Sequence, residues 1–180
     1  PVDLQQFLST AGSLTREQQE IFDEIISNTQ MEDNNQRKLY FAQGRGGSGK
    51  TFLMKHLLAK TRMNNKIAMV CATTALAASL YEHGCTAHHM FYIPVKEDKF
   101  DENPVMSTLH HHPERHELLL HTCLIIWDEF PNAQKEDFEA AYDALRGFRE
   151  ITFVACGDFH QIGPVVEQTA RPETAVAAII

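Results

Sequence analysis

Eight consecutive residues, Gly44 to Thr51, read GRGGSGKT and match the pattern G-x-x-x-x-G-K-[ST] in full. A short apolar run, Leu39 to Ala42, precedes them, and a segment of helical composition from about Gly49 to Thr61 follows. A strand, a glycine-rich loop and a helix in this order bring backbone N–H groups and a helix N-terminus close together. This arrangement favours the binding of a phosphate group. The motif therefore predicts a phosphate-binding loop. A glycine turn without a ligand is the alternative.

The residue types in this loop predict a role for each position. Lys50 should reach the β and γ phosphates of a nucleotide, and the Thr51 hydroxyl should ligate Mg²⁺. Four residues should turn their backbone N–H groups toward the phosphates: Gly46, Gly47, Ser48 and Gly49. We therefore expect ATP and Mg²⁺ as cofactors.

Apolar runs typical of strands alternate along the chain with segments of helical periodicity. The strand-like runs are Leu39 to Ala42, Ile67 to Ala72, Cys123 to Trp127 and Ile151 to Cys156. The helical segments are Ile21 to Ile26, Gly49 to Thr61, Thr73 to Tyr81 and Phe138 to Leu145. This alternation predicts an α/β fold, with a parallel β-sheet covered by helices on both faces. Such sheets bind ligands at the carboxyl ends of their strands.

Two carboxylates and a glutamine follow predicted strands. Asp128 is expected to hold Mg²⁺, directly or through water, and the adjacent Glu129 to activate the attacking water. Gln161 follows the last strand-like run and is expected to contact the γ-phosphate or that water. A second carboxylate directly after the first favours hydrolysis over nucleotide binding alone. A strand that ends in a solvated turn is the alternative.

The net charge of −8 is distributed unevenly along the chain. Residues 34–81 contain no acidic residue. The basic residues of that stretch are Arg37, Lys38, Arg45, Lys50, Lys55, Lys60, Arg62 and Lys66. This block can attract phosphate, although an ordinary solvated helix face is the alternative for Lys60 and Arg62.

Composition excludes several classes of protein. With 43% hydrophobic and 22% charged residues, the chain resembles a folded domain, and its apolar runs are shorter than the roughly 20 residues that span a bilayer. Four cysteines without CxxC spacing indicate buried, reduced thiols in an intracellular protein. The chain starts at Pro1 without a signal segment, so we expect an excised or processed fragment.

A group of histidines raises the question of a zinc site. Its members are His110, His111, His112, His116 and His121. No cysteine or carboxylate joins them at a recognised spacing, and Pro113 is expected to interrupt a helical i, i+4 face. We therefore do not expect zinc.

With these motifs in this order, the chain resembles the Pif-one family of superfamily-one DNA helicases, and within it the helicase portion of Helitron-type transposon proteins. The likeness runs from about Leu14 to the end of the chain. Leu14 to Gln18 resembles the Q motif, Ala72 to Ala78 motif Ia, Gly84 to His88 with Phe91 and Ile93-Pro94 the segment after it, Leu124 to Pro131 motif II, and Gly157 to Val165 motif III.

The resemblance implies a RecA-like P-loop NTPase domain over residues 14–180, after an N-terminal extension over residues 1–13. Family members carry a second RecA-like domain, which we expect to be absent here, so the isolated chain should be weakly active or inactive. The resemblance also implies ATP hydrolysis coupled to 5′ to 3′ translocation on single-stranded DNA and to unwinding, with no membrane partner. The cysteine usage predicts an intracellular location, and the resemblance a nuclear one in a eukaryote. DNA repair and recombination are among the roles that the resemblance implies, and replication, telomere maintenance and transposition stay open beside them.

Individual residues also receive roles from the resemblance. Gln18 would read the adenine, and its place in the capping box Thr15-Arg16-Glu17-Gln18 is an equally good explanation. The residues that would face single-stranded DNA are Thr73, Thr74, Thr86, His88 and Phe91. Core packing is the alternative for Phe91, and a structural role is the alternative for His88.

Two residues depart from the family pattern. His160 stands where the family usually has arginine, and Gly163 where it has an apolar residue, which weakens the case for γ-phosphate sensing through motif III. Two other function classes stay open: a nucleotide-binding module without turnover, and an unrelated P-loop enzyme such as a small-molecule kinase or an AAA-type ATPase. The pair Asp128 and Glu129 argues against a kinase, because a kinase needs no base dedicated to water.

Overall fold

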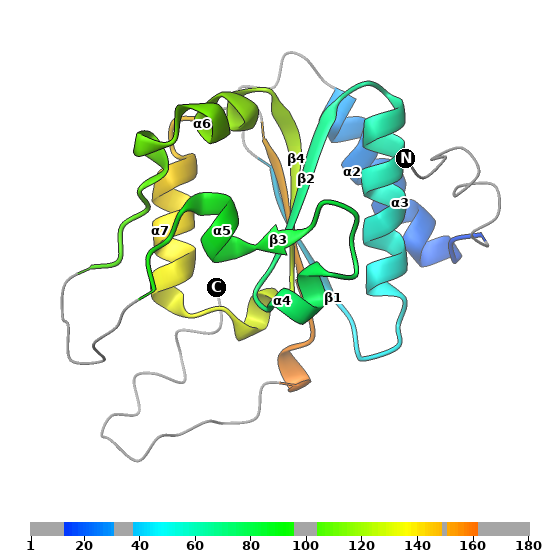
Figure 1. Cartoon of the computed structure of the whole chain (residues 1–180). Helices are drawn as coiled ribbons and strands as arrows, with labels where there is room; N and C mark the ends of the chain where they lie inside the picture. The colour runs from blue at the N-terminus through cyan, green and yellow to red at the C-terminus, as the bar shows by residue number, and fades with distance from the viewer. Residues whose placement is uncertain (1–12, 31–37, 96–103, 149–150, 162–180) are drawn as a thin grey trace.

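The computed structural model describes residues 13–30, 38–95, 104–148 and 151–161, and these contain a five-stranded sheet (Figure 1). The strand order is β1-β5-β4-β2-β3, and all neighbouring strands are parallel. The strands are β1 (Lys38–Gln43), β2 (Ile67–Ala72), β3 (Cys85–Thr86), β4 (Thr122–Asp128) and β5 (Thr152–Gly157). The predicted α/β fold with a parallel sheet is confirmed.

Helices cover both faces of this sheet. They are α2 (Arg16–Gln30), α3 (Lys50–Met63), α4 (Ala75–Ala78), α5 (Ala87–Phe91), α6 (Pro113–Leu120) and α7 (Lys135–Leu145). Short 3-10 turns are η1 (Leu109–His111), η2 (Phe130–Asn132) and η3 (Phe159–Gln161). In Figure 1, α2 and α3 lie on one side of the sheet, and α5, α6 and α7 lie on the other.

The central strand β4 supplies both cores. Leu124 and Ile126 pack with residues of α2 and α3, whereas Ile125 and Trp127 pack with residues of α5, α6 and α7. All four side chains have no exposed surface. A strand whose two faces are both covered needs apolar residues at every position, and this explains the uninterrupted apolar run in the sequence.

The parallel register brings the ends of separate strands to one edge of the sheet. Ala72 at the end of β2 pairs with Asp128 at the end of β4, and Gln43 of β1 pairs with Gly157 of β5. Polar residues that follow these strands therefore lie close together, which places the candidate site at the carboxyl edge.

The segment after β2 is less helical than the sequence predicts. A helix was expected over Thr73 to Tyr81, but α4 covers only Ala75–Ala78. The Thr74 side chain caps its start by accepting a hydrogen bond from the Ala77 backbone N–H at 3.2 Å. Beyond Ala78 the chain turns so that the Tyr81 side chain enters the core, and the helix ends there.

Two further features differ from the sequence-based expectations. Pro113 does not interrupt a helix but is the first residue of α6. Backbone N–H groups in the first turn have no partner within the helix, so the missing N–H of proline costs no hydrogen bond there. The strand β3 was not expected, because two residues show no periodicity.

All four cysteines are free, but only Cys71 and Cys156 are buried, while Cys85 and Cys123 are half-buried. Among the helices of the described residues, none combines the length and apolar character that crossing a membrane requires.

We predict that Gly157→Ala lowers the free energy of unfolding by about 1 to 3 kcal/mol, because the new Cβ would lie 2.2 Å from the Cδ atom of Pro131. Gly147→Ala is the matched control, since a Cβ there meets nothing within 4 Å. Urea unfolding of the two variants checks this. Equal stability of both would show that the contact between Gly157 and Pro131 is not tight.

Candidate active site

The glycine-rich loop lies between β1 and α3 at the carboxyl edge of the sheet. The Gly44 backbone N–H donates to the Gly157 carbonyl at 3.2 Å, which ties the start of the loop to the end of β5. Gly47 and Gly49 adopt left-handed backbone angles, with φ of 78° and 85°. Only glycine takes these angles readily, so the loop conformation depends on both residues.

The loop leads into the N-terminus of α3. The backbone N–H of Leu53 donates to the Gly49 carbonyl at 3.0 Å, so the N–H groups of residues 50–52 precede the first hydrogen bond of the helix. These groups and the helix dipole favour an anion. The Lys50 ammonium donates to the carbonyls of Gly44 and Arg45, at 3.0 Å for the latter, and so its charge lies within the loop.

Gln18 connects α2 with this loop. Its Oε1 accepts from the Thr15 backbone N–H at 3.0 Å, and its backbone N–H donates to Thr15 Oγ1 at 3.3 Å, so the predicted capping box is confirmed. At the same time its Nε2 donates to the Ser48 carbonyl at 3.3 Å. A Cβ on Gly49 would lie 2.7 Å from that Nε2 atom. The amide therefore serves both the helix and the loop, and adenine reading stays a prediction.

Asp128 accepts hydrogen bonds from three directions. Tyr81 Oη donates to Oδ2 at 2.5 Å, while Cys156 Sγ and the Glu129 backbone N–H donate to Oδ1 at 3.2 and 2.8 Å. The Tyr81 hydroxyl also interacts with the Thr51 side chain. Thr51 and Asp128, which the sequence assigns to Mg²⁺, therefore converge on a single hydroxyl group.

Burial sets the protonation of the two side chains that contact this carboxylate. Burial, followed by the neighbouring Asp128, raises the pKa of the Tyr81 hydroxyl and the pKa of the Cys156 thiol far above their ordinary values. Both groups therefore stay protonated at neutral pH and act as donors. A carboxylate that accepts these hydrogen bonds is held in one orientation.

Glu129 lies at the same edge in a strained backbone conformation. Its φ is 53°, in the left-handed region that residues other than glycine rarely occupy. Thr73 Oγ1 donates to its carbonyl at 2.8 Å, and Thr74 Oγ1 donates to its Oε2 at 2.7 Å. The hydroxyls of both threonines thus engage Glu129, and their predicted contact with DNA stays a prediction.

The end of β5 contributes a third element to this edge. Asp158 accepts from the His160 backbone N–H at 3.0 Å and lies 3.3 Å from the His160 ring. Burial opposes the charge of Asp158, but these hydrogen bonds and one from the Gly46 backbone lower its pKa. Gln161 ends η3 beside them, and its contact with the γ-phosphate stays a prediction. Gly163 lies outside the described residues.

Two of the residues assigned to DNA have structural partners. Thr86 caps α5 by accepting from the His89 backbone N–H at 3.2 Å. His88 Nε2 lies 3.3 Å from Asp137 Oδ1, which joins α5 to α7. Burial raises the pKa of Asp137, and the nearby His88 partly offsets this. A structural role for His88 therefore has direct support.

The structure contradicts the predicted contact of Phe91 with DNA. Its side chain is 0% exposed, and its ring lies 5.8 Å from the Trp127 ring in the core. A ring without exposed surface is unable to stack on a base. The core-packing interpretation is correct, and the DNA-stacking interpretation is wrong.

Two of the basic residues between positions 34 and 81 also support the fold. Arg62 donates to the Ala68 carbonyl at 3.2 Å, and Lys66 donates to the Thr29 carbonyl at 2.8 Å. Burial lowers the pKa of Arg62. Arg62 thus joins α3 to β2, and Lys66 joins the start of β2 to α2, so both side chains bind carbonyls away from the phosphate loop.

The histidines of the 110–121 segment have other neighbours. His112 stacks on Tyr92 with ring centroids 3.5 Å apart, His116 packs against Phe148, and His121 lies 3.6 Å from Glu117. Across the ranges that the structure describes, no three residues among His, Cys, Asp and Glu are grouped in a way that could hold a metal ion.

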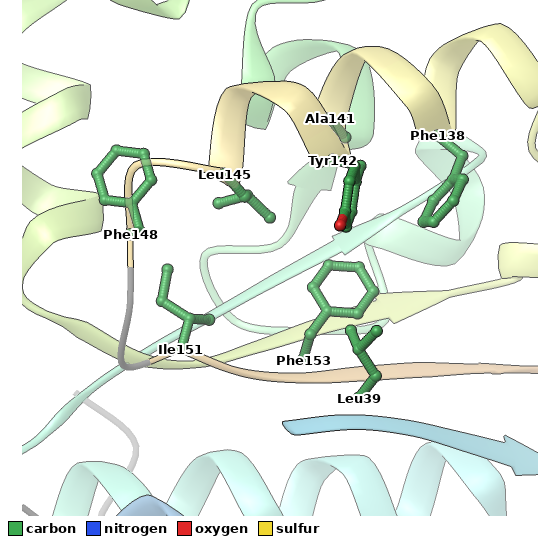
Figure 2. Close-up of a pocket in the computed structure, with 8 residues that line it drawn as sticks. All are labelled: Leu39, Phe138, Ala141, Tyr142, Leu145, Phe148, Ile151 and Phe153. Carbon is green, nitrogen blue, oxygen red and sulfur yellow. The ribbon is translucent and has the colours of Figure 1, made fainter. Parts of the chain in front are cut away.

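An apolar pocket lies away from these residues, between α7 and the strands β1 and β5 (Figure 2). Its lining consists of Leu39, Phe138, Ala141, Tyr142, Leu145, Phe148, Ile151 and Phe153. Leu39 pairs with Phe153 near the beginning of both strands, whereas the loop follows their carboxyl ends. The pocket is therefore separate from the candidate active site.

Tyr81 and Cys156 are the contacts that sequence reasoning missed. Tyr81 follows the short helix α4, and nothing in its local sequence indicates that its hydroxyl reaches Asp128. Cys156 belongs to an apolar strand in which a cysteine is ordinary. Only the alignment of β5 beside β4 shows that its thiol faces the carboxylate.

A phosphate loop, a helix N-terminus and paired carboxylates at the carboxyl edge of a parallel sheet define a RecA-like P-loop domain. The sequence model of the family described as PIF1-like helicase matches residues 13–180. This chain therefore belongs to the PIF1-like helicase family.

Known proteins resemble the chain over most of its length. It is 30% identical over 141 residues to the ATP-dependent DNA helicase PIF6 of Trypanosoma brucei brucei, which covers 74% of this chain and 17% of that protein. Crystal structures of Bacteroides Pif1 in complex with ADP-AlF4 and bound to single-stranded DNA are each 26% identical, with TM-scores of 0.60 and 0.59. Each match covers 91% of this chain and 35% of the solved chain. The chain thus spans a minor part of these relatives.

We predict that Phe91→Ala lowers the free energy of unfolding by about 3 to 5 kcal/mol, because it opens a cavity beside Trp127. Phe41→Ala, at a ring that is 42% exposed, should cost less. Chemical denaturation measures both, and fluorescence anisotropy with a labelled single strand should show unchanged DNA affinity for folded Phe91→Ala. Weakened DNA binding at unchanged stability would contradict the core assignment.

Proposed function

We propose that this chain is the nucleotide-binding motor domain of an ATP-dependent DNA helicase that translocates 5′ to 3′ on single-stranded DNA. The observation that carries the proposal is the convergence of Lys50, Thr51, Asp128 and Glu129 at one edge of the sheet. The similarity to a protein named ATP-dependent DNA helicase, and to Pif1 structures in complex with ADP-AlF4 and with single-stranded DNA, supports it.

In this proposal the loop and α3 hold the phosphates of ATP. The N–H groups of residues 50–52 bind phosphate oxygens, and the Lys50 ammonium moves from the loop carbonyls to the β and γ phosphates. The strength of these charged hydrogen bonds offsets those that Lys50 makes to Gly44 and Arg45. Binding of the triphosphate would therefore replace the contacts of Lys50 within the loop with contacts to phosphate oxygens.

The donor set beside Lys50 fits Mg²⁺. A threonine hydroxyl and a carboxylate are hard oxygen ligands of the kind that Mg²⁺ prefers, and Thr51 and Asp128 already meet at the Tyr81 hydroxyl. These two residues would hold the ion, which supplies positive charge to the phosphate oxygens.

Glu129 is the proposed general base. Its carboxylate accepts the proton of the water that attacks the γ-phosphorus, while the bond from the γ-phosphorus to the β-γ bridging oxygen breaks and ADP leaves. Asp128 is the less suitable base, because Tyr81, Cys156 and the Glu129 backbone already donate to its oxygens. The division of roles between the two neighbouring carboxylates follows from these partners.

Single-stranded DNA is the proposed macromolecular partner. The chain has a net charge of −8, so a DNA-binding face depends on local rather than overall charge. Residues 34–81 contain no acidic side chain and include α3 and α4, which adjoin the carboxyl edge. Thr73, Thr74, Thr86 and His88 lie in the segments proposed to face the strand.

Steady-state ATP hydrolysis with and without single-stranded DNA tests this function. We expect the wild-type chain to exceed Lys50→Ala, because the variant loses the ammonium that binds the phosphates. Glu129→Gln should still bind ATP with Mg²⁺ but should not hydrolyse it, because an amide is unable to accept the proton. A wild-type rate equal to that of Lys50→Ala would favour a nucleotide-binding module without turnover.

The two contacts of Gln18 predict a separation of stability from nucleotide binding. Gln18→Glu keeps an oxygen that accepts from Thr15 but loses the donor to Ser48, so it should retain the melting temperature and weaken ATP binding severalfold. Gln18→Ala should lower both. Thermal melting and titration with a fluorescent ATP analogue measure the two effects. Unchanged ATP affinity in Gln18→Glu would show that the contact with Ser48 does not support the site.

A further inference from the structure

The backbone of Glu129 is held in its left-handed conformation by several hydrogen bonds. Its own N–H donates to Asp128 Oδ1 at 2.8 Å, and its carbonyl accepts from Thr73 Oγ1 at 2.8 Å and from the Asn132 N–H at 2.9 Å. The Thr73 N–H also donates to the Asp128 carbonyl at 3.1 Å. A strained backbone persists only where its surroundings determine it in this way.

Thr73 connects the backbone of Glu129 with the buried core through two hydrogen bonds. Its hydroxyl accepts from Trp127 Nε1 at 3.0 Å and donates to the Glu129 carbonyl. Trp127 has no exposed surface and packs against the rings of Phe91 and Phe130. The position of the Thr73 hydroxyl is therefore set by the core.

Thr74 acts on the carboxylate itself. Its hydroxyl donates to Glu129 Oε2 at 2.7 Å and accepts from the Ala77 backbone N–H at 3.2 Å. One hydroxyl thus caps α4 and holds one oxygen of the carboxylate. With that oxygen held, rotation of the carboxylate is restricted, and the direction of its second oxygen is defined.

We propose that Thr74, supported by Thr73, is a positioning residue for Glu129, which it orients to take the proton of the attacking water. This inference rests on the proposed function. Capping alone does not require such a contact, since Thr86 caps α5 at the same 3.2 Å, and among the described residues its hydroxyl makes no hydrogen bond to a glutamate. The hydrogen bond to Glu129 is what distinguishes Thr74.

Three substitutions at position 74 separate orientation of Glu129 from capping. Thr74→Ser keeps the cap and the donor, and Thr74→Val loses both. Thr74→Gly keeps an acceptable N-cap without adding charge, but has no hydroxyl to donate to Glu129. Thr108→Val is the matched control, because it removes a threonine hydroxyl that donates a hydrogen bond away from the site, to the Tyr92 carbonyl at 3.1 Å.

The full chain with single-stranded DNA is assayed for the kcat and KM of ATP hydrolysis, and for its affinities for ADP and for ADP with aluminium fluoride. We expect both Thr74→Val and Thr74→Gly to lower kcat by about tenfold with KM changed less than about twofold. Both should weaken binding of ADP with aluminium fluoride but not of ADP, since only the former imitates the transferring phosphate. Thr74→Ser and Thr108→Val should match the wild type.

Each other outcome overturns the inference. Full kcat in Thr74→Gly with a loss in Thr74→Val would assign Thr74 to capping alone. Equal kcat in all variants would show that Glu129 needs no orientation by Thr74, while leaving the proposed function intact. Wild-type hydrolysis no faster than that of Lys50→Ala would show that this chain has no turnover of its own, and the assignment of Thr74 would fall with it.

Discussion

The parallel pairing of β4 between β2 and β5 is the constraint on which the rest of the structure depends. It requires apolar residues on both faces of β4, which pack against α2 and α3 on one side and α5, α6 and α7 on the other. It also brings Asp128 beside the ends of β2 and β5. The cores and the carboxyl edge that holds the candidate site are thus consequences of the same register.

The segment from Thr73 to Tyr81 contacts both carboxylates of the site. Thr73 and Thr74 bind Glu129, and Tyr81 binds Asp128. Since the segment includes α4, in which Leu76 is exposed and Ala77 and Ala78 are buried, a displacement of α4 would alter the hydrogen bonds of both carboxylates. The strength of a hydrogen bond to a charged group changes steeply with its geometry. Small displacements of α4 would therefore be enough to weaken these hydrogen bonds.

Much of the site follows from local sequence, and the exceptions share one cause. The positions of Lys50, Thr51 and the glycines depend on the backbone angles of the loop and on the start of α3. Residues close in sequence determine both. The sequence does not decide whether Phe91 contacts DNA or packs in the core, because a hydrophobic residue in a short helix is compatible with both. The helix predicted over Thr73 to Tyr81 is longer than α4. Helix propensity describes local sequence only, and it contains no information on the hydrogen bond between the Tyr81 hydroxyl and the distant Asp128.

The sequence by itself determined the class of fold, the phosphate loop and the identity of the paired carboxylates. Periodicity and glycine geometry depend on residues close together in the chain, and they are readable there. Only the tertiary structure decided which hydroxyls and thiols surround those carboxylates. Thr74 lies 55 positions from Glu129, and Tyr81 lies 47 positions from Asp128. Their contacts arise from the parallel alignment of β2 with β4, which no local pattern encodes.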